Sequence, residues 1–165
     1  MCCIVETPPE KIVPLSLADA RLLVEWMGRS EAWQKIDRLE EELERNPSAF
    51  FELPTEHVFT DGIYQRKVLM VAGRFITTRI HLTDHPYAII SGRVLVWTDD
   101  QGVIELSAPF TGITKAGTRR LLYILEDCQW MTTHANPDNE TDPDKIVERC
   151  TYNNRSLRIK MRARG

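Results

Sequence analysis

A group of basic side chains with strand-like spacing is the clearest chemical signal in this sequence. Arg79 and His81 stand two residues apart in a β-rich run, and His85 follows four residues later. Residues two apart on a strand share a face, so we expect these three side chains to point the same way. Arginine binds carboxylate and phosphate through paired hydrogen bonds, and a histidine beside a bound anion tends to become protonated. Where such side chains converge in a cavity, they would suit an anion.

The same stretch also offers donors for a metal ion. His81, His85 and Asp84 would together make the two-histidine, one-carboxylate set of non-haem iron enzymes. Alternation along a strand directs Asp84 away from its neighbour His85, unless a turn reorients it. Arg79 stays charged and has no acceptor, so it cannot be a ligand and repels a nearby cation. We favour no metal cofactor, and a divalent transition metal on the two histidines and Asp84 is the alternative.

Composition sets bounds on the class of protein. The chain has 165 residues, 42% of them hydrophobic and 27% charged, with a net charge of −3, which suits one ordinary globular domain. This balance gives no general attraction to nucleic acid or anionic lipid. The start lacks a basic segment followed by an apolar one, and no apolar run approaches ~18 residues, so we expect no signal peptide, no membrane span and a cytoplasmic location.

The four cysteines carry no metal-site spacing. Cys2, Cys3, Cys128 and Cys150 are expected to be reduced thiols in a chain without an export signal. Lipid attachment at the adjacent pair Cys2 and Cys3 is the alternative for those two.

Residues 1–50 are expected to form an N-terminal helical segment. Ser16 caps a first predicted helix that extends to Met27, and Ser30 caps a second one that stops at Asn46. The second helix carries an apolar stripe of Trp33, Ile36, Leu39 and Leu43, and its acidic run from Glu40 to Glu44 is predicted to face solvent. Because the stripe is continuous, we expect it to pack against the rest of the domain or a second chain.

From His57 onward the apolar period becomes two, which is typical of strands. The predicted strands are Ile63–Met70, Phe75–His81, Tyr87–Ile90, Val94–Trp97, Val103–Leu106, Arg120–Leu125 and Gln129–Thr133. Turn residues separate them, including Ser91-Gly92 and Glu126-Asp127. Many short strands indicate an all-β sandwich or barrel over residues 51–150, ending in a short helix from Asp144 to Cys150. Residues 151–165 are basic and are expected to be an edge strand, a partner-binding arm or a loose tail, with nucleic-acid binding not expected.

The stretch from His57 to His134 resembles the cupin superfamily in the spacing of its motifs. Gly73 is followed by five residues, then Arg79-Ile80-His81, then His85 and finally Gly92, which reproduces the first cupin motif with arginine for the first histidine and histidine for the glutamate. Lys115-Ala116-Gly117 occupies the turn of the second motif, and Arg120 stands where that motif has its histidine. The resemblance implies a jelly-roll barrel with these four side chains at the usual metal-ligand positions.

A closer likeness, over roughly residues 36–148, is to small cupin-like proteins of bacteriophages and prophages, whose function is largely unassigned. It includes Glu56-His57-Val58-Phe59, the Lys115-Ala116-Gly117 turn, the stretch from Glu126 to His134, and Asn139-Glu140-Thr141-Asp142. In a cupin the face that Arg79, His81 and His85 share points into the barrel.

The resemblance thus implies that Arg120 joins these side chains in one cavity, with Lys115 and Tyr123 near its mouth or on the same strands. The other reading is that Arg79 and Arg120 pair with acidic residues inside the barrel or at its rim. His57 and His134, outside both motifs, are expected to be hydrogen-bonded structural histidines, and Trp97 and Trp130 to be core residues.

These observations leave three functions open. The first is a cupin-like protein without catalytic activity that binds an anionic ligand, phosphate-bearing and nucleotide- or sugar-like, for example a phage accessory protein that sequesters a signalling nucleotide. The second is a metal-dependent oxygenase or isomerase, and the third is a structural or interaction module. In each case we expect a homodimer.

Overall fold

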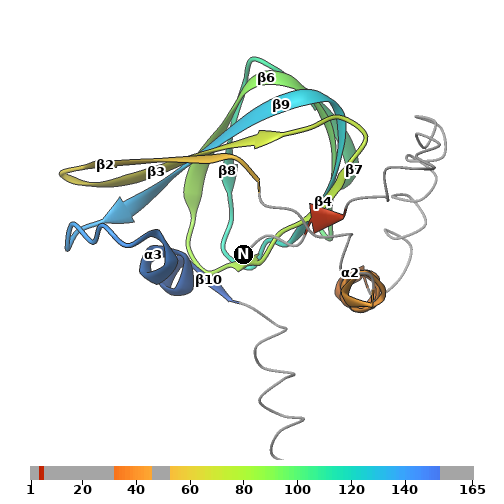
Figure 1. Ribbon diagram of the computed structural model, residues 1–165, viewed down its shortest axis with the longest axis horizontal. Helices are drawn as coiled ribbons and strands as arrows, with labels where there is room; N and C mark the ends of the chain where they lie inside the picture. The colour runs from red at the N-terminus through yellow and green to blue at the C-terminus, as the bar shows by residue number, and fades with distance from the viewer. Residues whose placement is uncertain (1–3, 6–31, 46–52, 153–165) are drawn as a thin grey trace, which may run out of the picture.

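The computed structural model describes residues 4–5, 32–45 and 53–152, and shows an antiparallel β-barrel with helices beside it (Figure 1). The predicted all-β fold class is confirmed. The first predicted helix, Ser16 to Met27, and the tail after Tyr152 lie outside the described residues. No helix within the described ranges has the length and apolar character needed to span a membrane.

Two long strands form the frame of the barrel. β6 (His85–Thr98) and β9 (Arg120–Asn136) pair antiparallel along most of their length. The predictions of turns at Ser91-Gly92 and at Glu126-Asp127 were wrong, because both strands continue through these positions with shifts in register. Gly92 has φ +84°, and a Cβ there would overlap the backbone carbonyl of Asp127. The glycine therefore allows a bulge in a continuous strand.

The remaining strands extend from these two. One path of paired strands runs β1 (Ile4–Val5), β4 (Phe75–Thr77), β9, β3 (Gly62–Met70) and β2 (Thr55–Thr60). β7 (Gly102–Ser107) and β8 (Phe110–Thr114) pair with β6. The predicted strand Phe75–His81 is divided, since its last residues form β5 (Ile80–His81), which pairs with β10 (Thr151–Tyr152) after the C-terminal helix.

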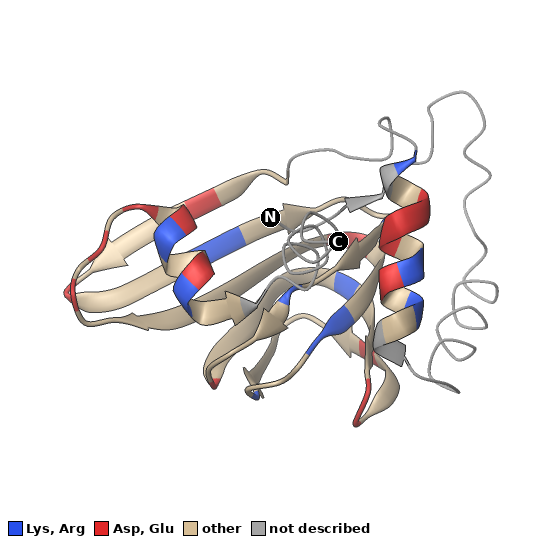
Figure 2. Ribbon diagram, turned by 90° about the horizontal axis from the view of Figure 1, so that it is seen from below, with Lys and Arg blue, Asp and Glu red and all other residues tan. Residues whose placement is uncertain are grey.

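Helix α2 (Ala32–Glu44) packs on the outside of the barrel. Ile36 is completely buried against Trp97 and Leu121, and Leu39 packs beside it. The side chain of Trp33 lies outside the described part, and Leu43 is half-buried. Acidic and basic positions alternate along this helix (Figure 2).

One acidic residue of α2 departs from the prediction that this run faces solvent. Glu40 is only 8% exposed and binds Arg119 of the barrel at 3.0 Å, while Asp37 binds the same guanidinium at 2.7 Å. Arg119 itself is 3% exposed, so these two ion pairs fasten the helix to the barrel.

Candidate ligand-binding site

A cavity of about 90 Å³ lies inside the barrel at the end where α3 (Pro143–Cys150) packs. Strands β3, β4 and β9 supply most of its wall, and α3 and β10 cover it. The side chains that line it are Leu53, Tyr64, Arg66, Val68, Met70, Ile76, Thr78, Arg79, His81, Arg120, Leu122, Trp130, Thr132, His134, Ile146, Val147, Cys150 and Thr151.

Arg120 is the most deeply buried cation of this cavity, with 6% of its surface exposed. Its Nη2 donates to the hydroxyl of Thr114 at 3.0 Å, and its guanidinium carbon lies 5.1 Å from the ring centre of Tyr87 and 5.8 Å from that of Trp130. Among the described residues no carboxylate forms an ion pair with it. Burial lowers the pKa of Arg120 below its usual value, which marks the cost of keeping this charge out of water.

Three histidine rings are in contact beside Arg120. The ring centres of His81 and His85 are 4.7 Å apart, and those of His85 and His134 are 4.2 Å apart. Nδ1 of His85 donates to the carbonyl of Thr83 at 3.1 Å. One buried nitrogen on each ring has no hydrogen-bond partner in the described structure: Nδ1 of His81, Nε2 of His85 and Nδ1 of His134.

The imidazoles are held in their neutral form. Burial is the main cause that lowers the pKa of His81 to about 3 and that of His134 to about 4, and the neighbouring His85 and the arginines lower both further. Burial also lowers the pKa of His85. At neutral pH the site therefore carries the charge of its arginines and three uncharged rings, each with one buried nitrogen that has no hydrogen-bond partner in the described structure.

The structure brings Arg79, His81 and Arg120 to the cavity wall, with His85 directly behind them against the ring of His81. Two other predicted site residues lie elsewhere. Lys115 is exposed at the surface and pairs with Asp84 at 2.7 Å. Tyr123 lies on the opposite face of β9, where it packs against Phe75 and Leu95, because odd-numbered positions of that strand face outward.

Sequence reasoning missed His134, Arg66 and Tyr64, which also line the cavity. His134, expected to be a hydrogen-bonded structural histidine, lines this cavity. The expectation of a hydrogen-bonded His57 agrees with its 2.7 Å contact to the Tyr64 hydroxyl. His134 has the same parity as Arg120 along β9, so a single long strand would have placed both on one face. The presumed turn at Glu126 concealed this relation.

The residues of this site do not suit the metal centre that the cupin motifs imply. Two of the four motif positions hold arginine, and a buried guanidinium would repel a cation. Asp84 is half-exposed and is directed to Lys115 and to the backbone N–H of Ala116, away from the cavity. Within the described ranges no group of three or more His, Cys, Asp or Glu side chains is arranged to hold a metal ion. We derive no chemistry through a metal.

Helix α3 closes the cavity with Ile146, Val147 and Cys150. The side chain of Asp142 caps its first turn by accepting from the N–H of Asp144, and Pro143 begins the helix. The predicted short helix from Asp144 to Cys150 agrees with this element. Burial raises the pKa of the Cys150 thiol, so a reactive thiolate is disfavoured at neutral pH.

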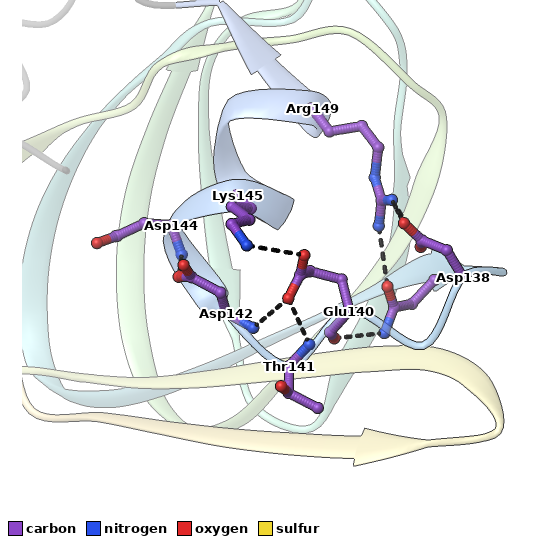
Figure 3. Close-up of polar contacts among 8 residues, drawn as sticks. Asp138, Glu140, Thr141, Asp142, Asp144, Lys145 and Arg149 are labelled. Atoms are coloured by element: carbon purple, nitrogen blue, oxygen red, sulfur yellow. Dashed lines mark hydrogen bonds and ion pairs between the residues drawn. The ribbon is translucent and has the colours of Figure 1, made fainter.

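A polar network anchors α3 to the end of β9 (Figure 3). Arg149 binds both carboxylate oxygens of Asp138 at 2.7 Å and donates to Asn136 at 2.9 Å. Glu140 accepts from the backbone N–H groups of Thr141 and Asp142. These contacts fix the helix over the cavity.

Comparison with known proteins adds information on the barrel alone. No family model matches the sequence, and no curated protein matches it. An RmlC-like cupin family protein with a double-stranded β-helix fold from Methanocaldococcus jannaschii is 13% identical, with a TM-score of 0.44 over 53% of this chain and 84% of that one.

Two further solved structures give similar values. An uncharacterised protein with a double-stranded β-helix domain from Klebsiella pneumoniae is 17% identical, with a TM-score of 0.45 over 54% of this chain and 81% of that one. A Lactobacillus farciminis oxalate decarboxylase in a formate complex is 15% identical, with a TM-score of 0.45 over 59% of this chain and 38% of that one. The strand order and pairing described above show an antiparallel β-barrel.

Proposed function

We propose that this protein binds an anionic small molecule in the cavity of its barrel. The observation that carries the proposal is the composition of the wall. Its eighteen described side chains include three arginines and two histidines, and none is Asp or Glu. Buried cations are normally paired with carboxylates, and Arg120 has no such partner among the described residues.

Arg120 supports this proposal most strongly. A buried guanidinium without a carboxylate is costly, and the ring contacts and one hydroxyl offset only part of that cost. A carboxylate or phosphate would satisfy the remaining N–H donors through paired hydrogen bonds, and the low-dielectric interior would strengthen the attraction. As neutral imidazoles, His81 and His134 can each donate one ring N–H to the same anion.

Binding without catalysis is the part of the proposal that the cavity chemistry favours. The wall's histidines, His81 and His134, have lowered pKa values and are weak bases, and its one thiol, Cys150, has a raised pKa. A phosphate-bearing ligand of nucleotide or sugar type, and a phage role in sequestering such a ligand, remain predictions from the sequence. A homodimer is proposed as well, supported by the exposed apolar side chains Ile63, Leu69, Ile90 and Ile113 on β3, β6 and β8.

A thermal-shift screen tests the proposal. The panel contains inorganic phosphate, small carboxylates, sugar phosphates, nucleotides and cyclic dinucleotides. A ligand at a hundredfold excess over its dissociation constant should stabilise the fold by ~2.7 kcal/mol, or roughly 5–10 °C for a chain of this size. Arg79→Ala and Arg120→Ala should each abolish the shift.

The matched control is Arg38→Ala, which removes an exposed arginine of α2 distant from the cavity. It should leave the ligand shift unchanged. If no anion stabilises the wild type, or if all three variants respond as the wild type does, anion capture is refuted and the interaction-module function takes its place.

A further inference from the structure

Polar and apolar residues are separated along the first wall of the cavity. The register of β3 on β9 places four pairs of inward-facing residues in sequence, the first two polar and the last two apolar: Tyr64–His134, Arg66–Thr132, Val68–Trp130 and Met70–Cys128. The polar pairs lie at the end near α3, since Tyr64 packs with Ile146 and Cys150 of that helix. The apolar pairs therefore form the deeper part of this wall.

The second wall has the same polarity. Ile76 of β4 is opposite Leu122 of β9, and both belong to the main apolar core. Two residues later Thr78 accepts from the backbone N–H of Arg120 at 2.9 Å. The chain then continues to His81, which pairs with Thr151 immediately after α3. Both walls thus change from apolar to basic in the direction of α3.

The volume limits what can enter. One water-sized group takes up roughly 10–15 Å³ of cavity volume. The cavity of about 90 Å³ therefore has room for roughly six to nine non-hydrogen atoms. A nucleoside monophosphate is more than twice as large. A bare phosphate ion would fill the basic end and leave the apolar end without a contact.

We infer that the ligand is a compact amphiphilic anion: one carboxylate or phosphate group held at the basic end by Arg120, and a short hydrocarbon or single-ring body seated against Leu122, Val68 and Trp130. The inference rests on the proposed function and narrows its ligand class, because it excludes the nucleotides that the sequence analysis suggested. We call Leu122, Val68 and Trp130 the apolar floor of the cavity. Under this inference the apolar floor, and not the arginines, selects among anions.

A series of straight-chain carboxylates from acetate to decanoate tests it by calorimetric titration of the full chain. Each methylene added should tighten binding by about fourfold while it is buried against the floor. The affinity should reach a maximum when the molecule has roughly six to nine non-hydrogen atoms, as in butyrate to heptanoate, and fall beyond it. Benzoate should bind, adenosine monophosphate should not, and Arg120→Met should weaken every member of the series.

Two variants at adjacent positions of β9 test whether the apolar floor sets the chain length of maximum affinity. Leu122→Ala deepens the floor and should move the maximum to longer chains, whereas Leu121→Ala, which empties a similar volume on the α2 side, should not move it. If either variant fails to fold, the wild-type series alone decides. Affinity that is independent of chain length, or a nucleotide that binds more tightly than hexanoate, overturns the inference and leaves anion capture standing. Absence of binding by any anion overturns both.

Discussion

Arg119 and Arg120 are adjacent, similarly buried and differently paired, and this contrast yields a sharp test of the site. Arg119 is 3% exposed and binds Asp37 and Glu40, whereas Arg120 is 6% exposed and has no carboxylate partner among the described residues. Arg119→Met leaves two largely buried carboxylates without their cation. Breaking a buried ion pair in this way costs about 3–5 kcal/mol.

For Arg120→Met, the free energy lost with the contacts of the guanidinium and the free energy gained by removing a buried charge are of similar size. The variant loses one hydrogen bond from a charged donor, about 1.5–3 kcal/mol, and two cation–π contacts of about 0.5–2 kcal/mol each. It is relieved of the desolvation of an unpaired guanidinium, which amounts to several kcal/mol. We therefore expect the ligand-free protein to change in stability by only about 1 kcal/mol.

Urea unfolding of the two variants and the wild type, followed by circular dichroism at pH 7.5, measures both values. We expect a large decrease in the free energy of unfolding for Arg119→Met and almost no decrease for Arg120→Met. An equal loss in both would mean that Arg120 is paired inside the protein. Arg120 would then contribute to folding stability through an internal partner, and an anion site at this residue would be refuted.

Three further predictions concern the metal, the histidines and α2. Protein purified without chelator should carry clearly less than one transition metal per chain by elemental analysis; a stoichiometric metal lost in His81→Ala would favour the enzyme instead. Because the folded protein holds His81 and His134 neutral, with pKa values of about 3 and 4, the unfolded chain takes up protons first, so stability should fall as pH drops below about 6.5. At pH 5 the loss should be about 2 kcal/mol per histidine, and a free energy of unfolding that is equal at pH 7.5 and pH 5 would contradict it. Deletion of residues 1–46 exposes the surface that Ile36 covers and should lower the melting temperature or the mass measured by light scattering, where the full chain should be a dimer; a truncated chain with unchanged values would count against both.

Much of the fold could be predicted because alternation and motif spacing are local properties. The positions of Arg79, His81 and Arg120 at the cavity follow from the spacing of the two motifs, although Arg79 lies between β4 and β5 and not on one continuous strand with His81. The length of β6 and β9 could not be predicted, because Gly92 and Asp127 have the composition of turns and form bulges only when the two strands are paired. That error hid the place of His134.

The pairing of Arg119 also could not be anticipated from sequence. Its partners Asp37 and Glu40 are about eighty residues away and belong to a helix whose acidic residues have the pattern of a solvent-exposed face. Alternation correctly directs Arg119 away from Arg120, but only the packing of α2 shows that the outward side is covered. Arg119 is therefore unsuitable as a neutral control for Arg120, and the exposed Arg38 serves that purpose.

The most direct test of anion capture is a crystal structure of the wild-type protein with the anion that gives the largest thermal shift. If Arg120 captures the anion, we expect density inside the barrel, with the carboxylate or phosphate oxygens within hydrogen-bond distance of the Arg120 guanidinium. An anion bound outside the barrel, or one inside it with its charged group away from Arg120, would contradict anion capture by Arg120.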